Sequence, residues 1–188
     1  MRTHLTRPRG KQVDQGVNVL IWSFIELQGN VTDDPVQEGP DPATLAAVVT
    51  ALHRKGVSVT HLVSVGGWGA PHPDIARTGD EWWEIWKRWD AGFAKRVGLS
   101  TQLWSGFAGV DLDVEGSDTQ SSPDNRFSPE LMELCGNFAL AAKRDNYVST
   151  MVPPQSYLDC GSPHYALNGS VEFADEWAPS FPYHGRNT

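Results

Sequence analysis

Residues 107–115 read Phe107-Ala-Gly-Val-Asp-Leu-Asp-Val-Glu115, a short run in which apolar and acidic side chains alternate. Side chains on a β-strand point alternately to its two faces, so these residues divide into two sets. The first set is entirely apolar and suits packing beneath helices: Ala108, Val110, Leu112 and Val114. The second set ends in three carboxylates: Phe107, Gly109, Asp111, Asp113 and Glu115. The stretch therefore predicts a strand with one buried face and one face that concentrates negative charge.

Three carboxylates on one strand face repel one another unless protons are shared. Neighbours on the same face lie roughly 6–7 Å apart, and at an effective dielectric of about 20 each ionised pair costs on the order of 2–3 kcal/mol. At least one raised pKa is therefore expected, and a general acid that works near neutral pH needs one. A solvated edge strand, a satisfied ion-pair network and a calcium or magnesium site are the alternatives. The pattern favours catalysis over all three.

The placement of Asp113 and Glu115 on the same side of one strand limits the mechanism. Ordinary retaining glycosidases use two carboxylates on opposite sides of the sugar, about 5–5.5 Å apart. Two side chains that project in the same direction cannot flank a sugar ring in that way. A nucleophile must then come from another strand, from water or from the substrate, where a 2-acetamido group beside the anomeric carbon is suited to the task.

The rest of the chain alternates between apolar strand patterns and helical patterns. Strands are predicted at 17–25, 57–65, 107–115 and 147–152, and helices at 43–55, from Asp80 onward, and at 129–144. Asp41 before Pro42 and Ser128 before Pro129 are typical helix N-caps. Strands and helices that alternate, with near-continuous apolar strands, predict an α/β fold with parallel strands.

The bulk composition bears on the class of protein and on its partners. The chain has 188 residues and a formal net charge of −8, which disfavours a nucleic-acid partner. No apolar run approaches the roughly 20 residues of a membrane span, and no signal-peptide core is visible near the N-terminus. No phosphate-binding loop, nucleophile elbow or metal-ligand spacing is present, so neither a cofactor nor a metal is expected. Eight tryptophans indicate a large core or a sugar-stacking cleft, and Trp82, Trp86 and Trp89 recur at the helical spacing of core residues.

Three segments occur in an order and spacing that are familiar from one family. They are Ser64-Val-Gly66-Gly67, Gly-Val-Asp-Leu-Asp-Val-Glu at 109–115, and Tyr-Val-Ser-Thr-Met-Val-Pro-Pro-Gln at 147–155. They resemble the Ser-x-Gly-Gly strand end, the Asp-Gly-x-Asp-x-Asp-x-Glu signature and the plant-type fifth strand of family 18 glycoside hydrolases, which are chitinase-type enzymes. The chain departs from the signature at Ala108, where the family has an aspartate.

The resemblance implies a (β/α)8 TIM barrel with its active site at the C-terminal ends of the strands. It also implies retaining hydrolysis of chitin, the β-1,4-linked polymer of N-acetylglucosamine. Glu115 would be the proton donor, Asp113 would orient the substrate acetamide and stabilise the oxazolinium ion, and Asp111 would hold Asp113 through a shared proton. Family 18 uses the substrate's acetamide as the nucleophile, which agrees with the same-side placement of the carboxylates.

The length of the chain covers only part of such a barrel, which typically takes ~250 residues. Residues 17–25 resemble the family's second strand and the three segments resemble its third to fifth strands, so residues 1–188 are expected to be a single incomplete catalytic domain. Within it, residues 1–15 are expected to be disordered and residues 156–188 mostly loop. The resemblance implies an extracellular protein whose partner is chitin or an N-acetylglucosamine oligosaccharide, with no nucleic acid and no membrane.

Five further residues are predicted to bind the substrate: Trp68, Gly67, Ser64, Gln155 and Tyr157. Trp68 follows Gly67 at a strand's C-terminal end, where it either stacks on a sugar ring or serves as a core or loop anchor. Gln155 binds substrate or caps its loop, and Tyr157 is equally open. Two alternatives to an active enzyme stay open. One is a carbohydrate-binding protein without catalysis, against which the retained Glu115 argues, and the other is an inactive fragment.

Overall fold

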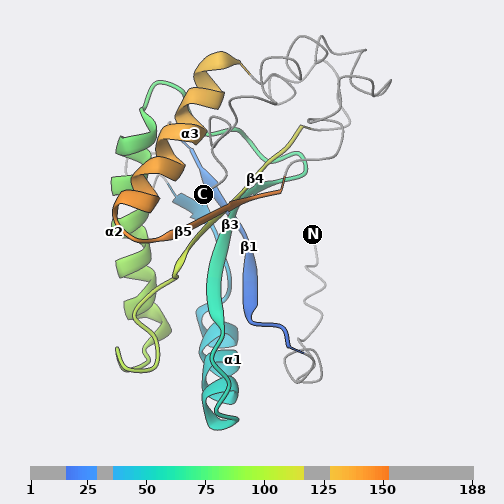
Figure 1. Ribbon diagram of the computed structural model, residues 1–188, viewed down its shortest axis with the longest axis vertical. Coiled ribbons are helices and arrows are strands. Elements are labelled where there is room, and N and C mark those ends of the chain that lie inside the picture. The colour runs from blue at the N-terminus through green and yellow to red at the C-terminus, as the bar shows by residue number, and fades with distance from the viewer. Residues whose placement is uncertain (1–15, 29–35, 117–127, 153–188) are drawn as a thin grey trace.

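The computed structural model describes residues 16–28, 36–116 and 128–152, which form three helices and a five-stranded sheet (Figure 1). In chain order the elements are β1 (Val19–Leu27), β2 (Val36–Glu38), α1 (Pro42–Arg54), β3 (Thr60–Gly67), α2 (Gly79–Val97), β4 (Gly109–Val114), α3 (Pro129–Arg144) and β5 (Val148–Met151). The strand order is β2-β1-β3-β4-β5, in which β2 is antiparallel to β1 and the other neighbours are parallel. The predicted α/β fold with parallel strands is confirmed, and β2 is an addition to it.

Each helix begins at a residue whose side chain caps it. The Asp41 carboxylate accepts a hydrogen bond from the backbone N–H of Thr44 at 2.8 Å, and Ser128 caps α3 in the same way. Thr78 caps α2 through a capping box with Glu81, in which each side chain accepts from the other's backbone N–H. The predicted start of this helix at Asp80 is therefore one residue late, because the helix begins at Gly79 directly after its cap.

The hydrophobic core lies between the sheet and the three helices, which cover one of its faces (Figure 1). Helix α2 contributes a run of indole rings to this core. Trp82 and Trp86 are completely buried and Trp89 is nearly so, which confirms the predicted core stripe. Trp83 stacks on Trp86 with ring centroids 4.7 Å apart. The tryptophans of α2 therefore serve as packing residues rather than as a sugar-stacking surface.

Strand β4 is shorter than predicted, and this changes the role of two residues. Its pairing begins at Gly109, so the alternation of faces does not extend back to Phe107. Phe107 is buried on the helix side, where it stacks on Trp89 and Phe93 instead of sharing a face with the carboxylates. Ala108 is exposed rather than packed beneath helices. The interior of the strand follows the prediction, with Val110, Leu112 and Val114 in the core.

The face of the sheet that turns away from the helices is open among the described residues. Apolar side chains at both sides of it are exposed: Val19 by 42%, Ile21 by 46% and Val148 by 43%. Within the described ranges no helix is long and apolar enough to cross a membrane. Residues 1–15 and 156–188, predicted to be disordered and mostly loop, lie outside the described residues.

Candidate active site

The pairing of β3, β4 and β5 aligns a row of polar residues across the open face. Ser64 of β3 pairs with Asp111 of β4, and Asp111 pairs with Thr150 of β5. Two residues further along, Gly66 lies opposite Asp113. Since residues two apart on a strand share a face, Asp111 and Asp113 both lie on the face opposite the helices. The row therefore leads toward the C-terminal end of the parallel strands.

Asp111 is held in place by two hydroxyl groups. Ser64 Oγ donates a hydrogen bond to Oδ2 at 2.9 Å, and Thr150 Oγ1 donates one to Oδ1 at 2.6 Å. Asp111 and Ser64 are each only 2% exposed. Both carboxylate oxygens of Asp111 thus accept hydrogen bonds from neighbouring strands. The resemblance implies a proton shared between Asp111 and Asp113, but these two described side chains form no hydrogen bond with each other. Ser64, which is predicted to bind substrate, is one of the two residues that hold this carboxylate in place.

Asp113 lies in surroundings that favour its protonated form. Burial, then the negative charges of Glu115 and Asp111, and finally a hydrogen bond with Glu115 raise the pKa of Asp113 to about 7. The side chain is 8% exposed, and no lysine or arginine among the described residues forms an ion pair with it. The expected raised pKa within the cluster therefore belongs to Asp113, which holds a proton close to neutral pH.

The two glycines that end β3 allow a close approach of its neighbours. Gly66 and Gly67 have φ values of +104° and +100°, a region that L-residues with side chains rarely adopt. A Cβ atom on Gly66 would lie 2.4 Å from the carbonyl oxygen of Asp113, and one on Gly67 would lie 3.1 Å from the Phe24 ring. The glycine pair therefore brings the end of β3 against the backbone beside the carboxylates.

Glu115 follows the last residue of β4 and is half-buried. The loop after β3 forms two hydrogen bonds with the backbone that directly follows β4. His72 Nε2 donates a hydrogen bond to the Glu115 carbonyl oxygen at 2.8 Å, and the Gly69 N–H donates to the Gly116 carbonyl at 2.9 Å. Sequence reasoning assigned no chemistry to His72. The position of His72 could not be predicted, because a hydrogen bond to a backbone carbonyl depends on neither the type nor the spacing of the accepting residue.

Of the other four predicted substrate-binding residues, Gly67 and Trp68 lie at the C-terminal end of β3. Trp68 follows β3 and is 57% exposed, so its ring is available to a ligand and is not a core anchor. Gly67 is buried beside Phe24. Gln155 and Tyr157 lie outside the described residues.

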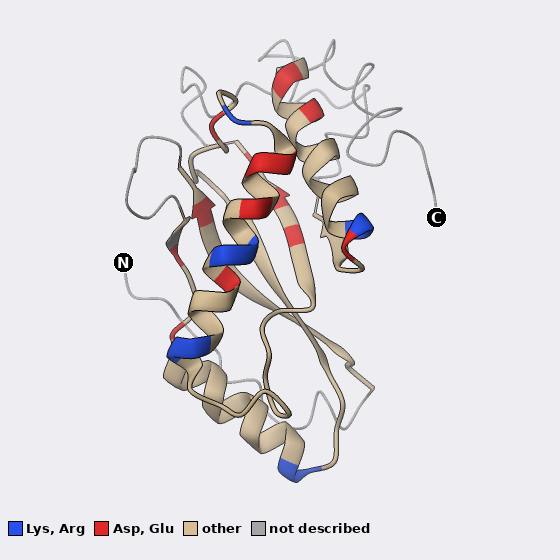
Figure 2. Cartoon of the chain, turned by 90° about the vertical axis from the view of Figure 1, so that its left-hand side faces the viewer, with Lys and Arg blue, Asp and Glu red and all other residues tan. Residues whose placement is uncertain are grey.

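Negative charge dominates the described part of the sheet. None of the five described strands contains a lysine or arginine, so the acidic side chains have no basic neighbour on the sheet itself (Figure 2). Basic residues lie on the helices instead: Lys95, Arg96, Lys143 and Arg144 in the last turns of α2 and α3, and Lys87 and Arg88 in the middle of α2. Among the described residues, no group of three or more His, Cys, Asp or Glu side chains is placed to hold a metal ion.

The site can therefore hold and transfer a proton at the end of a parallel strand. Asp113 and Glu115 form a carboxyl pair that retains a proton near neutral pH, and Asp111 adds a fixed negative charge behind them. A scan against family models, a search of curated proteins and a search of solved structures each found no match to this chain. A functional assignment must therefore rest on the residues themselves.

Proposed function

We propose that this chain carries catalytic residues of a glycoside hydrolase that cleaves chitin or related β-1,4-linked N-acetylglucosamine chains, as family 18 enzymes do. The observation that carries the proposal is the Asp113–Glu115 pair. Asp113 has a pKa of about 7, and Glu115 forms a hydrogen bond with it at the C-terminal end of a parallel strand. A pair of this kind is what protonation of a glycosidic oxygen near neutral pH requires.

In the proposed reaction the proton of the Asp113–Glu115 pair moves to Glu115 and leaves Asp113 ionised. Glu115 then gives this proton to the glycosidic oxygen as the bond to the anomeric carbon breaks. The acetamide oxygen of the same sugar attacks that carbon and forms an oxazolinium ion, whose positive charge Asp113 stabilises. Water then opens the ion, and its proton returns to the Glu115 carboxylate. Asp111, fixed by Ser64 and Thr150, keeps Asp113 in an environment of negative charge. The same-side placement of Asp113 and Glu115 favours this substrate-assisted route over a carboxylate nucleophile.

The sheet itself is proposed to be part of a (β/α)8 barrel. The three described helices cover one face of its parallel strands, and the other face combines the polar row with exposed apolar side chains. In a closed barrel that second face would be the interior, with the active site at the C-terminal ends of the strands.

Hydrolysis of a fluorogenic chitooligosaccharide by this protein tests the proposal. Glu115→Gln should lower kcat at least 100-fold, because general acid catalysis contributes about 10²–10⁴-fold. Glu133→Gln, which changes an exposed glutamate of α3, is the matched control and should leave turnover unchanged. Turnover that survives Glu115→Gln, or no turnover by the unaltered protein, would refute the assignment.

A second substrate tests the acetamide's role. A fluorogenic oligosaccharide with a hydroxyl in place of each acetamide should not be cleaved, because it lacks the nucleophile. Equal cleavage of both substrates would contradict the substrate-assisted route and point to a protein nucleophile.

A carbohydrate-binding protein without catalysis is the second candidate, favoured by the exposed indole of Trp68. Saturable binding of a chitooligosaccharide that is lost in Trp68→Ala, without hydrolysis, would support this candidate instead.

A further inference from the structure

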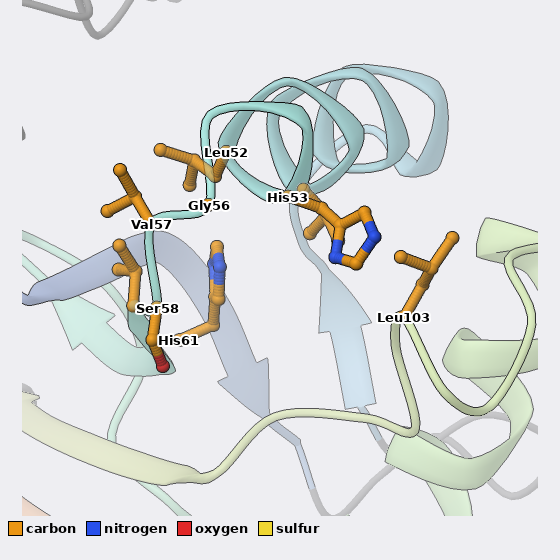
Figure 3. Close-up of a pocket in the computed structure, with 9 residues that line it drawn as sticks. Leu52, His53, Gly56, Val57, Ser58, His61 and Leu103 are labelled. Atoms are coloured by element: carbon orange, nitrogen blue, oxygen red, sulfur yellow. The ribbon is translucent and has the colours of Figure 1, made fainter.

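A cavity of about 380 Å³ opens at the other end of the sheet, far from the carboxylates. It lies between the end of α1, the chain that leads into β3, and Leu103 of the segment between α2 and β4 (Figure 3). His61, the second residue of β3, lines it, and Gly66, which lies opposite Asp113, is five positions further along the same strand. At about 3.3 Å per residue this places the cavity roughly 16 Å from the carboxylate end. The cavity is therefore distinct from the candidate active site.

The described walls of this cavity combine aliphatic side chains with polar groups in about equal surface area, and they include no side chain of permanent charge. Aliphatic side chains from α1, from the start of β3 and from the later loop line it: Val49, Leu52, Val57, Val59 and Leu103. The rest of the described lining consists of two histidines, one serine and one glycine, and it includes no carboxylate, lysine or arginine. The volume of the cavity lies within the range of about 300–1,000 Å³ that ligand pockets of proteins have.

His61 presents an oriented hydrogen-bond donor in this cavity. Trp22 Nε1 donates a hydrogen bond to His61 Nδ1 at 3.0 Å, so Nδ1 is an acceptor and the proton of the neutral ring resides on Nε2. Burial lowers the pKa of His61 to about 4, which keeps the ring neutral at physiological pH. The tautomer is thus fixed by a neighbouring residue.

The imidazole ring is also held rigidly, and its donor is free. Trp22 stacks against His61, and Trp104 meets it edge-on with ring centroids 5.2 Å apart. Within the described ranges no group accepts a hydrogen bond from Nε2. The rings of His61 and His53 both project into the space beneath the end of α1 (Figure 3). A rigid donor without an acceptor, in a cavity of ligand size, is arranged for a bound molecule.

We propose that this cavity binds a compact, uncharged small molecule that has an apolar body and a carbonyl or hydroxyl oxygen, which accepts a hydrogen bond from Nε2 of His61. The aliphatic walls supply the affinity for the apolar body, and the single donor supplies the orientation. Charged ligands are excluded because the lining offers no group of opposite fixed charge to compensate for desolvation.

Two probes of the same shape test the proposal, acetophenone and α-methylstyrene, which differ by a carbonyl oxygen against a methylene group. In an NMR titration acetophenone should saturate with a Kd on the order of 1 mM, as befits a fragment of this size. The signals of His61 Nε2 and of the Trp22 indole N–H should shift with it. α-Methylstyrene should bind at least tenfold more weakly. Equal affinities, or no saturation by acetophenone up to its solubility limit, would overturn the proposal.

A cavity-filling variant localises the binding. Leu103→Trp should abolish the acetophenone shifts, because the larger ring occupies the cavity. Leu140→Trp changes an exposed leucine of α3 outside the cavity lining and should leave the titration unaltered. Loss of binding in both variants, or in neither, would show that acetophenone does not bind here.

Discussion

Asp111 and Asp113 stand two residues apart on β4 and face the same way, yet their surroundings give them different roles. Hydroxyl groups of Ser64 and Thr150 donate to both oxygens of Asp111, so this side chain is a fixed acceptor. Asp113 instead shares a hydrogen bond with Glu115 and is buried beside two other carboxylates. The polarity of the neighbouring strands, and not the residue type, therefore decides which carboxyl holds a proton.

Asp113 should make the folded state less stable as pH rises, and Asp113→Asn tests this. Its pKa is raised from 3.8 to about 7 in the folded state, so folding favours the protonated form. That contribution to stability is complete below pH 4 and is lost as pH rises through 7. At pH 8 the free energy of unfolding of Asp113→Asn should exceed that of the unaltered protein by on the order of 2 kcal/mol, after allowance for solvent screening. The difference should vanish near pH 4, as measured by urea denaturation.

A carboxylate of the opposite kind provides the control. Asp145 lies in an exposed ion pair with Lys87, which lowers the pKa of Asp145 and makes its contribution present at neutral pH and lost in acid. Asp145→Asn should therefore lower stability slightly at pH 8 rather than raise it. If Asp113→Asn behaves like Asp145→Asn, the account of Asp113 is wrong.

Part of this site can be predicted from the sequence, because the strand's period of two follows from local geometry. The alternation of Asp111 and Asp113 with apolar residues identifies the face and the cluster. Ser64, Thr150 and His72 reach the cluster only through pairings between distant segments. Nothing local specifies the registers of β3 and β5 against β4, so Ser64 and Thr150 could not be assigned as partners of Asp111.

At the scale of elements, the contact between α2 and α3 depends on one glycine. Gly79, the first residue of α2, is buried, and a Cβ atom there would lie 2.3 Å from the carbonyl oxygen of Leu134 and 2.4 Å from the backbone nitrogen of Phe138. Both atoms belong to the backbone of α3, which cannot yield as a flexible side chain can. The absence of a side chain at Gly79 therefore sets how closely the two helices approach.

Gly79→Ala should destabilise the protein by about 3 kcal/mol, because the added methyl group pushes the helices apart and loosens the tryptophan packing. Gly92→Ala, in the same helix, is the matched control. The nearest atom to a Cβ there is an Arg96 guanidinium nitrogen at 3.9 Å, so alanine should stabilise α2 by about 0.5–1 kcal/mol. Urea denaturation of the two variants should give shifts of opposite sign. Equal shifts would show that the α2–α3 approach does not depend on Gly79.

The elements themselves were largely predictable where local signals mark them. The N-caps Asp41 and Ser128 stand where expected because a capping side chain bonds only to residues near it in sequence. Strand β2 escaped prediction since its three residues carry no periodicity and gain their structure only by pairing with β1. The missed burial of Phe107 has the same origin, because the point where β4 begins depends on its neighbours.

At the scale of the whole molecule, the two faces of the sheet differ in what covers them. The helix face holds nearly all buried apolar side chains, whereas the opposite face leaves Val19, Ile21 and Val148 exposed near the polar row. Alternation of strands and helices predicts the first face, because each helix needs an apolar surface to pack on. Local sequence patterns do not predict what packs against the second face, because a sheet closes into a barrel only through pairing between distant strands.

The open face should behave as an accessible apolar surface in solution. The protein should bind the dye ANS, whose fluorescence rises on exposed apolar surface. The double substitution Ile21→Thr and Val148→Thr should lower that fluorescence at least twofold, with little change in stability because threonine suits strands and both positions are exposed. Ile75→Thr, in a loop where the side chain is 55% exposed, is the control and should leave the signal nearly unchanged. If the open face is in fact covered, the double substitution will instead cost several kcal/mol of unfolding free energy, as apolar groups lost from a core do.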